Sequence, residues 1–556
     1  MSSTSTLSRS NSDPRSSLRV NYLAPTIPKW PNDLPIIELR DLWKSFGGQE
    51  VIRGLNLKIK PGQTTIIAGE SGSGKSVLLK MMNGLILPDQ GEVLLFGQSL
   101  TKITEAERTE LRKRCTMVFQ NYALIDSMTV HKNISFPLLQ NTSMTLPEID
   151  KLVLELLELL ELPGIGELMP SSLSGGMKKR VALARAVISN PELVLFDEPT
   201  TGLDPVMIEF VDSLIAKTQA NYGITSVMIS HDMASNRRLA DHLAILSHGQ
   251  IVEQGSFEEV ARSEHPDVKR FMESAVTERM QRGGHEESSF KSSERSEAIA
   301  RLSNVRKSFG DREILKGITL DIPKNKILVI IGGSGSGKSV LVKHIIGLFQ
   351  PSSGKVEVFD KDITSGQRHL LRETQREIGV LFQGAALFDS MSVRDNIAFP
   401  LVEGRRQSPN AVAPLVDEIA KKMSVAHLLD KWPDAISNGE KKRVALARAL
   451  ITRPKIMIYD EPTTGQDPIM MKRVDDMIVE AAKLFEMTSI VISHDMGSTF
   501  RIADEIAMIY HGELLAHGPP ELVKKSSDPR VQSFIFAGDQ APASGEPTEE
   551  SSNVSP

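Results

Sequence analysis

The stretch Gly69-Glu-Ser-Gly-Ser-Gly-Lys-Ser76 decides the fold, and it has a counterpart, Gly332-Gly-Ser-Gly-Ser-Gly-Lys-Ser339, in the second half of the chain. The two lysines of these loops lie 263 residues apart. The same offset relates five further pairs: Gln120 and Gln383, Ser174 and Ser437, Asp197 and Asp460, His231 and His494, and Pro266 and Pro529. A repeat of this length far exceeds a solenoid unit of about 20 to 50 residues. Each copy is therefore predicted to be a domain.

The composition is that of an ordinary globular protein: 556 residues, 24% charged and 40% hydrophobic. A formal net charge of −5 gives no electrostatic reason to expect a nucleic-acid partner. The single cysteine, Cys115, cannot form an internal disulfide, which fits a reducing compartment. A reactive thiol is disfavoured because no partner residues are evident. No apolar run approaches the roughly 20 residues that span a bilayer. We expect a soluble chain whose membrane role, if any, depends on partner subunits.

Composition shifts suggest five parts. Residues 1–34 are rich in Ser, Arg, Asn and Pro and predict disorder, which we prefer to a transit peptide because no arginine-faced amphipathic helix is visible. The domains are expected at 35–276 and 298–538. The charged, Gly- and Ser-containing stretch 277–297 predicts a flexible linker, and the polar residues 539–556 predict a disordered tail.

Apolar strands and helices alternate within each domain. A strand runs into each glycine-rich loop, and a helix is expected to begin at the loop lysine. The stretch 148–161 has apolar residues at helical spacing and predicts a helix that packs on its own subdomain rather than a coiled coil. Strands at 193–196 and 456–459 end in Asp-Glu, and another precedes each His-Asp pair. This order predicts an α/β fold with a parallel sheet covered on both faces.

The glycine-rich loops have the composition of a phosphate-binding loop. Glycines let backbone N–H groups turn toward a phosphate, and the following helix N-terminus adds partial positive charge. We expect Lys75 and Lys338 to contact the terminal phosphates of ATP, and Ser76 and Ser339 to coordinate Mg²⁺. Two copies in register make a ligand-free glycine turn a negligible alternative. The predicted loop residues are Gly69, Ser71, Gly72, Gly74, Lys75 and Ser76, with Gly332, Ser334, Gly335, Gly337, Lys338 and Ser339.

The acidic pairs that end the apolar strands predict a hydrolytic site. Asp197 and Asp460 stand where a carboxylate can reach Mg²⁺. Glu198 and Glu461 follow directly and are expected to orient or deprotonate the attacking water. A strand-ending turn is the alternative for either Asp-Glu-Pro copy alone, but the paired context favours catalysis.

Together these motifs resemble ATP-binding-cassette (ABC) ATPases across both domains. The segment Leu173-Ser-Gly-Gly-Met-Lys-Lys-Arg180 looks like the ABC signature. The resemblance implies two P-loop NTPase domains, each with a mainly parallel sheet, an antiparallel β part and a helical subdomain. It also implies Q-loop glutamines that contact Mg²⁺ and water, histidines that contact the γ-phosphate, and aromatic residues that stack on adenine. These are Gln120 and Gln383, His231 and His494, and Phe46 and Phe309.

In this family two cassettes bind head to tail, so the resemblance implies two composite sites within one chain. One joins Lys75 with the second signature, and the other joins Lys338 with the first, which supplies Ser174, Gly175 and Gly176. The second signature reads Ile436-Ser-Asn-Gly-Glu440 and keeps only Ser437 and Gly439. Asn438 adds a side chain where backbone should approach the nucleotide, and Glu440 places an acid near phosphate. We expect the Lys338 site to hydrolyse faster; the alternative is that Asn438 is tolerated and both sites work alike.

The segments after the Q-loop glutamines resemble the ATPases of MCE-type lipid transporters, of the Mla (maintenance of lipid asymmetry) kind. So do Gly465-Gln-Asp467 and the ending Asp528-Pro-Arg-Val-Gln-Ser-Phe534. This resemblance implies a place on the cytoplasmic face of the inner (plasma) membrane, with the helical subdomains docked to integral-membrane permease subunits. It implies phospholipid transport, with an MCE-domain protein and an accessory subunit as further partners.

Three rivals remain. A sugar-importer ATPase is the nearest, although such tandem chains often carry a damaged second phosphate loop and Gly332 to Ser339 is intact. A ribosome-associated ABC translation factor is disfavoured by the short linker, broken at Gly283-Gly284, and by the mildly acidic chain. A DNA-repair ATPase is disfavoured because neither domain is interrupted by a long coiled coil or a zinc-ligand cysteine set.

Overall fold

The computed structural model describes residues 30–120, 122–280, 297–382 and 384–536. We call residues 30–280 the first repeat and residues 297–536 the second repeat. Three predictions fall outside the described residues: the disorder of residues 1–29 and 539–556, the linker residues 281–296, and the site residue Gln383.

The first repeat contains, in chain order, β1 (Ile37–Phe46), β2 (Gln49–Ile59), β3 (Thr64–Ala68), α1 (Lys75–Met82), β4 (Gln90–Leu95), β5 (Gln98–Ser99), α2 (Glu105–Arg114), β6 (Cys115–Val118), α3 (Val130–Asn141), α4 (Leu146–Leu159), η2 (Pro170–Ser172), α5 (Gly175–Val187), β7 (Leu193–Asp197), α6 (Pro205–Tyr222), β8 (Thr225–Ile229), α7 (Met233–Leu239), β9 (His242–Ser247), β10 (Gln250–Gly255), α8 (Phe257–Ala261) and α9 (Pro266–Met280).

The second repeat contains β11 (Ala298–Phe309), β12 (Arg312–Pro323), β13 (Ile327–Ile331), α10 (Lys338–Ile345), β14 (Ser353–Val358), β15 (Lys361–Asp362), α11 (Arg368–Arg376), β16 (Ile378–Leu381), α12 (Val393–Val402), α13 (Pro409–Lys422), η3 (Ala426–Leu428), η4 (Pro433–Ala435), α14 (Asn438–Leu450), β17 (Ile456–Asp460), α15 (Pro468–Leu484), β18 (Thr488–Ile492), α16 (Met496–Ile502), β19 (Glu505–Tyr510), β20 (Glu513–Gly518), α17 (Pro520–Lys524) and α18 (Pro529–Ile535).

Each repeat has two sheets. The first repeat pairs four strands in the order β2-β1-β4-β5 and six in the order β10-β9-β3-β8-β7-β6, and the second repeats this with β12-β11-β14-β15 and β16-β17-β18-β13-β19-β20. In the second repeat β16 through β19 are parallel, β20 is antiparallel, and the four-stranded sheet is antiparallel. The predicted α/β fold, with its parallel sheet, antiparallel part and helices, is confirmed.

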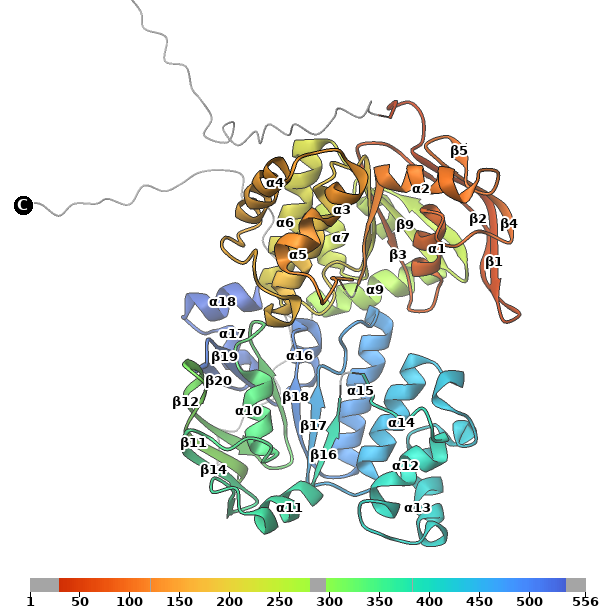
Figure 1. Ribbon diagram of the computed structural model, residues 1–556. Helices are drawn as coiled ribbons and strands as arrows, with labels where there is room; N and C mark the ends of the chain where they lie inside the picture. The colour runs from red at the N-terminus through yellow and green to blue at the C-terminus, as the bar shows by residue number, and fades with distance from the viewer. Residues whose placement is uncertain (1–29, 121, 281–296, 383, 537–556) are drawn as a thin grey trace, which may run out of the picture. The chain divides into compact units, whose positions relative to one another are not determined.

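The central strands are apolar throughout because both of their faces are buried. In the second repeat Val329, Tyr459 and Val491 point into a core shared with α14 and α15. Their neighbours Ile330 and Ile458 point into a separate core shared with α10 and the antiparallel sheet. Alternate residues of a strand point to opposite faces, so one strand serves both cores. Figure 1 shows α10 and α15 on opposite sides of β16–β18.

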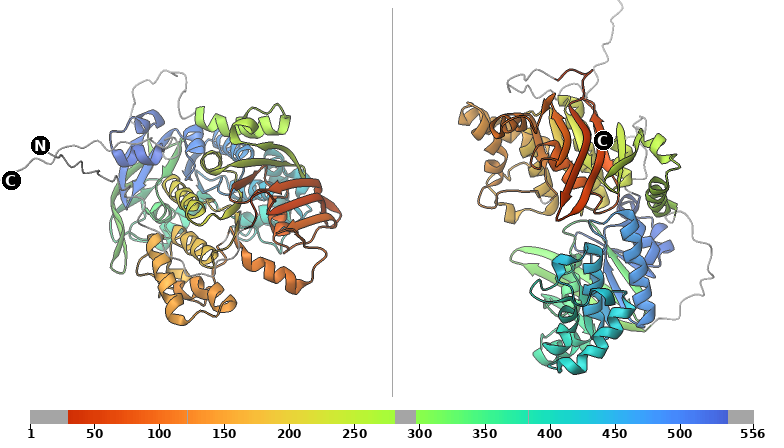
Figure 2. Two further views of the ribbon diagram at one scale, coloured as in Figure 1. Left: turned by 90° about the horizontal axis from the view of Figure 1, so that it is seen from above. Right: turned by 90° about the vertical axis from the view of Figure 1, so that its right-hand side faces the viewer.

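Helices between the Q-loop and the signature form a subdomain of each repeat. In the first repeat α4 buries Ile149, Leu152, Val153, Leu156 and Leu157 along one face, and Leu160 follows at its end. The predicted amphipathic helix is therefore present, and α3 and α5 are its partners. The right-hand view of Figure 2 shows these orange helices gathered to one side of the red strands.

Two expected boundaries differ from the structure. The first repeat begins before residue 35, because Trp30 packs edge-on against Phe96 and donates its backbone N–H to Glu192 at 3.0 Å. Helix α9 continues through Met280, four residues into the expected linker, whereas β11 begins at Ala298. Among the helices of the described ranges, none combines the length and apolar character needed to cross a membrane.

Candidate nucleotide-binding and hydrolysis sites

The glycine-rich loops adopt conformations that only glycine fits. Gly69 has φ of 148°, and a Cβ atom there would lie 2.1 Å from the carbonyl oxygen of Leu246 in β9. Gly332 has φ of 144°, and its Cβ would lie 2.0 Å from the carbonyl oxygen of Ile509 in β19. Any side chain would collide with backbone. The loop is thus seated against the neighbouring strand in the same way in both repeats.

The loop lysines begin α1 and α10 and turn back over their own loops. Lys75 Nζ donates to the carbonyl oxygens of Gly69 and Glu70, both at 2.8 Å. Lys338 Nζ donates to those of Gly332 at 2.7 Å and Gly333 at 3.0 Å. Burial lowers the pKa of Lys338 to about 8, although the Glu461 carboxylate opposes this shift. An ammonium group has three N–H donors, so Lys338 can add an anion to these two contacts.

A serine and an aspartate meet where a divalent cation would bind. Ser76, at the start of α1, donates its hydroxyl to Oδ1 of Asp197, at the end of β7, over 3.1 Å. Two oxygens about 3 Å apart match adjacent ligands of an octahedral Mg²⁺ ion with bonds of about 2.1 Å. In the second repeat the pKa of Asp460 is raised, first by burial and then by the charge of Glu461.

The donor set suits Mg²⁺ that arrives with a nucleotide. No group of three or more His, Cys, Asp and Glu residues that could hold a metal occurs in the described part of the chain. Mg²⁺ typically takes one or two protein oxygens and completes its shell with phosphates and water. The residues present therefore fit Mg²⁺, which Ser76 and Asp197 would hold in the first repeat.

The two glutamates have a strained backbone. Glu198 has φ of 51° and Glu461 has φ of 49°. Their N–H groups donate to the carbonyl oxygens of Ile229 and Ile492, the last residues of β8 and β18. A left-handed conformation costs a non-glycine residue roughly 1–2 kcal/mol, and such strain tends to collect at functional sites.

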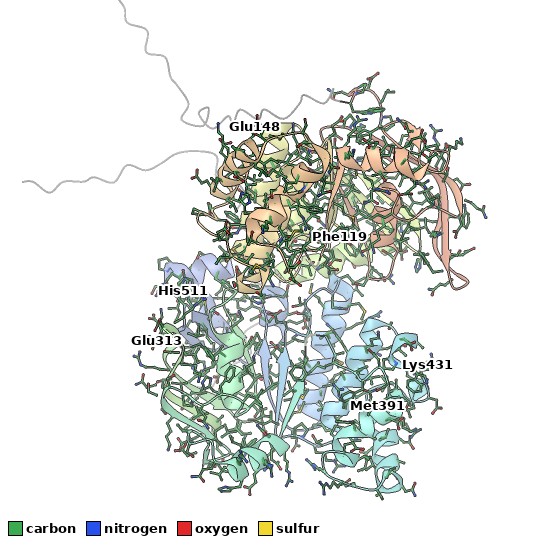
Figure 3. The ribbon with its side chains drawn as sticks, in the orientation of Figure 1. Phe119, Glu148, Glu313, Met391, Lys431 and His511 are labelled. Atoms are coloured by element: carbon green, nitrogen blue, oxygen red, sulfur yellow. The ribbon has the colours of Figure 1, made fainter. Side chains whose placement is uncertain are left out.

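Each glutamate carboxylate contacts a residue from another predicted motif. Gln120 Nε2 donates to Oε2 of Glu198 at 2.8 Å, and Phe119, labelled in Figure 3, links that glutamine to β6. His494 Nε2 lies 2.7 Å from Oε1 of Glu461. The structure thus brings together glutamine and glutamate in one repeat, and histidine and glutamate in the other.

The Glu461 carboxylate is ionised at neutral pH. Burial would raise its pKa, but the hydrogen bond from His494 and the charges of His494 and Lys338 outweigh burial and lower it. Thr464 Oγ1 also donates to Oε2 at 3.2 Å. The side chain is 21% exposed. An ionised and accessible carboxylate can accept a hydrogen bond from a water molecule and withdraw its proton.

The predicted adenine-stacking residues lie at strand ends. Phe46 ends β1 and Phe309 ends β11, and each is 47% exposed. The ammonium of Lys44 lies 5.4 Å from the first ring centroid, and that of Lys307 lies 5.2 Å from the second. A half-exposed aromatic ring can stack on a planar base.

The two signature helices begin differently. Ser174 is the N-cap of α5, and its Oγ accepts from the Met177 N–H at 3.3 Å. Ser437 caps α14 in the same way, but its N–H and its hydroxyl also both donate to Glu440 Oε2 at 2.8 Å. These hydrogen bonds, the backbone one first, lower the pKa of Glu440. The second signature thus carries an anion of its own. The side chain of Asn438 is not among those that the structure describes.

Four basic residues near these sites had no predicted role, although one of them, Lys179, lies within the signature-like segment 173–180. They lie on the helices that follow the signatures: Lys179 and Arg185 on α5, and Lys442 and Arg448 on α14. Lys179 and Lys442 are 263 residues apart, and so are Arg185 and Arg448, which is the offset of the other repeated motifs. This repetition is the sequence signal from which a role for these residues could have been inferred.

The family comparison agrees with this geometry. The ABC transporter family model matches residues 52–201 and 315–464, one match in each repeat. The chain belongs to the ABC transporter family. It carries two ATP-binding cassettes in one polypeptide and is an ATPase of that family.

Relatives of two kinds match this chain. An ABC transporter ATP-binding protein of Methanocaldococcus jannaschii is 29% identical over 530 residues, which are 87% of this chain and 95% of the relative. The ATP-binding protein MlaF of the intermembrane phospholipid transport system of Haemophilus influenzae is 38% identical over 237 residues, which are 43% of this chain and 90% of MlaF. A solved dimeric ATP-binding cassette with bound ADP and phosphate is 32% identical and covers 40% of this chain and 98% of its own, with a TM-score of 0.38.

Proposed function

We propose that this chain is the ATPase subunit of a phospholipid transporter of the MCE/Mla type, working at the cytoplasmic face of a membrane through separate permease subunits. The observation that carries the proposal is the 38% identity to MlaF over 237 residues, about the length of one repeat. The Q-loop segments and Gly465-Gln-Asp467 support the same branch. An MCE-domain protein and an accessory subunit are the further partners that this branch implies.

ATP hydrolysis takes place at two composite sites in this proposal. Each phosphate-binding loop holds the nucleotide phosphates with its lysine, and the hydroxyl and carboxylate at its base hold Mg²⁺. Glu198 and Glu461 withdraw a proton from the attacking water, and His231 and His494 face the γ-phosphate. Phe46 and Phe309 stack on adenine. The signature of the other repeat completes each site.

The two sites differ in rate because the signatures differ. In the second signature the Ser437 hydroxyl donates to Glu440, so it is not available to a γ-phosphate oxygen. The Glu440 carboxylate also repels a phosphate from the N-terminus of α14, where an anion would otherwise be favoured. Transition-state stabilisation depends on donors placed in advance. The Lys75 site, which uses this signature, is therefore the slower one.

The test is recovery of the whole complex from detergent-solubilised membrane with the full chain as bait. We expect permease and MCE-domain subunits with bound phospholipid. Reconstitution into liposomes with a fluorescent phospholipid should show ATP-dependent transfer that the Glu198→Gln/Glu461→Gln double variant abolishes. Recovery of a sugar permease, ribosomes or DNA in place of these partners would overturn the lipid assignment.

A further inference from the structure

In each repeat, one arginine of the helix that follows the signature donates hydrogen bonds to the Q-loop backbone. In the second repeat Arg448 donates from one nitrogen to the carbonyl oxygen of Ala386 at 2.7 Å and from another to that of Ala385 at 3.0 Å. In the first repeat Arg185 donates in the same way to Ala123 at 2.7 Å and Tyr122 at 2.9 Å. The chain thus contains the same two-pronged contact twice.

The residues that accept these arginine hydrogen bonds have a strained backbone. Ala385 and Ala386 have φ of 61° and 49°, and Tyr122 and Ala123 have φ of 63° and 46°. Two consecutive left-handed residues without glycine are unfavourable. A guanidinium group presents a rigid fork of donors that binds two acceptors at once, which a lysine ammonium does not reproduce. The arginine therefore holds the loop in a shape that it would not keep alone.

We call Glu198-Pro199 and Glu461-Pro462 the glutamate turns. The same helix contacts the glutamate turn through a lysine six residues before the arginine. Lys442, which is buried, donates to the carbonyl oxygen of Pro462, the residue after Glu461. In the first repeat Lys179 is equally buried; burial lowers its pKa to about 7, and the charge of Glu198 acts in the opposite direction. Its ammonium also lies 5.8 Å from the ring centroid of Tyr122. Six helical residues span about 9 Å, so one rigid helix meets two loops.

We propose that Arg185 and Arg448, with Lys179 and Lys442, are positioning residues that fix the Q-loop and the glutamate turn to the signature helix. The inference rests on the proposed function of the glutamines and glutamates, and it adds how their positions are set. Because signature, Q-loop and glutamate turn are tied to one helix, a shift of the signature moves the other two together. The four basic side chains act through backbone carbonyls and the neighbouring glutamate rather than on the nucleotide.

The experiment compares Arg185→Lys/Arg448→Lys with wild type in the full transporter complex. The lysines keep the charge and remove the fork. We expect kcat for ATP to fall tenfold or more, while KM changes less than about twofold and the melting temperature changes little. Arg453→Lys is the control, because Arg453 is a largely exposed residue just beyond α14.

A rescue separates positioning from general stabilisation. Glycine adopts left-handed backbone without strain, so Ala123→Gly/Ala386→Gly in the lysine background should recover at least threefold in kcat. Unchanged kcat in the lysine variant, or a loss of kcat that follows the melting temperature and is not rescued, would overturn the inference. An inactive wild-type complex would instead count against the proposed function.

Discussion

His494 Nε2 lies 2.7 Å from Glu461 Oε1, although the two residues are 33 positions apart in sequence. Their strands explain the contact. β17 and β18 are parallel neighbours in which Asp460 pairs with Ile492, so the residues that follow both strands emerge at one sheet edge. Functional side chains that follow neighbouring parallel strands therefore lie close together at the carboxyl edge of the sheet.

The first prediction concerns the unequal sites. Glu461→Gln should lower the ATP turnover of the complex to less than about a third of wild type, whereas Glu198→Gln should leave more than about half. Loss of a general base removes roughly 10²- to 10⁴-fold at its own site, so the residual rate reports the other site. Steady-state phosphate release measures both variants, and equal losses would contradict the asymmetry.

A second prediction isolates the signature. In the Glu461→Gln background, Glu440→Met should raise the remaining turnover about threefold to tenfold, because it frees the Ser437 hydroxyl and removes the anion. The matched change in the first signature, Met177→Glu in the Glu198→Gln background, should lower turnover by a similar factor. Glu440→Gln keeps a capping side chain without the charge and so separates the two causes. No response to the reciprocal pair would exclude Glu440 as the reason.

The third prediction is a pH dependence of nucleotide binding by the second repeat. The pKa of Lys338 is about 8 without nucleotide, and bound phosphates favour the charged ammonium, so binding above pH 8 takes up a proton. Affinity should therefore weaken as pH rises from 8 to 10, by up to about tenfold per pH unit. Fluorescent-nucleotide titrations in the Lys75→Ala background measure this, with Lys361→Arg as a surface control. Lys338→Arg should flatten the dependence, because guanidinium stays protonated.

The fourth prediction uses the sole cysteine. Cys115 is buried at the start of β6, and burial raises the pKa of its thiol to about 12. The thiolate is the reactive form, so at pH 8 a folded chain should react with a thiol reagent more than about 10³-fold slower than an unfolded one. Pulse labelling through a urea series should follow unfolding of the first repeat. Rapid labelling without urea would contradict the buried position.

Much of the fold could be predicted from sequence because it rests on local pattern. The strands at 193–196 and 456–459 are apolar along their whole length, and the loop glycines occupy positions that exclude side chains, so both features are visible residue by residue. Of the site, the partners Ser76 and Asp197, and His494 and Glu461, follow from their places at strand and helix ends.

What escaped prediction depends on tertiary contacts. Trp30 belongs to the first repeat because of Phe96 and Glu192, which are distant in sequence. The grip of Arg448 on Ala385 requires a fold in which α14 passes the Q-loop. The Glu440 contact could have been predicted, because Ser-x-x-Glu at a helix start is the capping-box pattern.

The left-handed backbone of Glu461 implies a conflict between robustness and turnover. Glycine would relieve about 1–2 kcal/mol of strain there and lose roughly 0.5–1 kcal/mol through its greater chain entropy. Glu461→Gly should therefore stabilise the second repeat by up to about 1 kcal/mol while removing its water-activating carboxylate. Selection for thermostability alone would therefore favour loss of ATPase activity at this position. Heat-stable variants should be assayed for ATP turnover as well as for melting temperature.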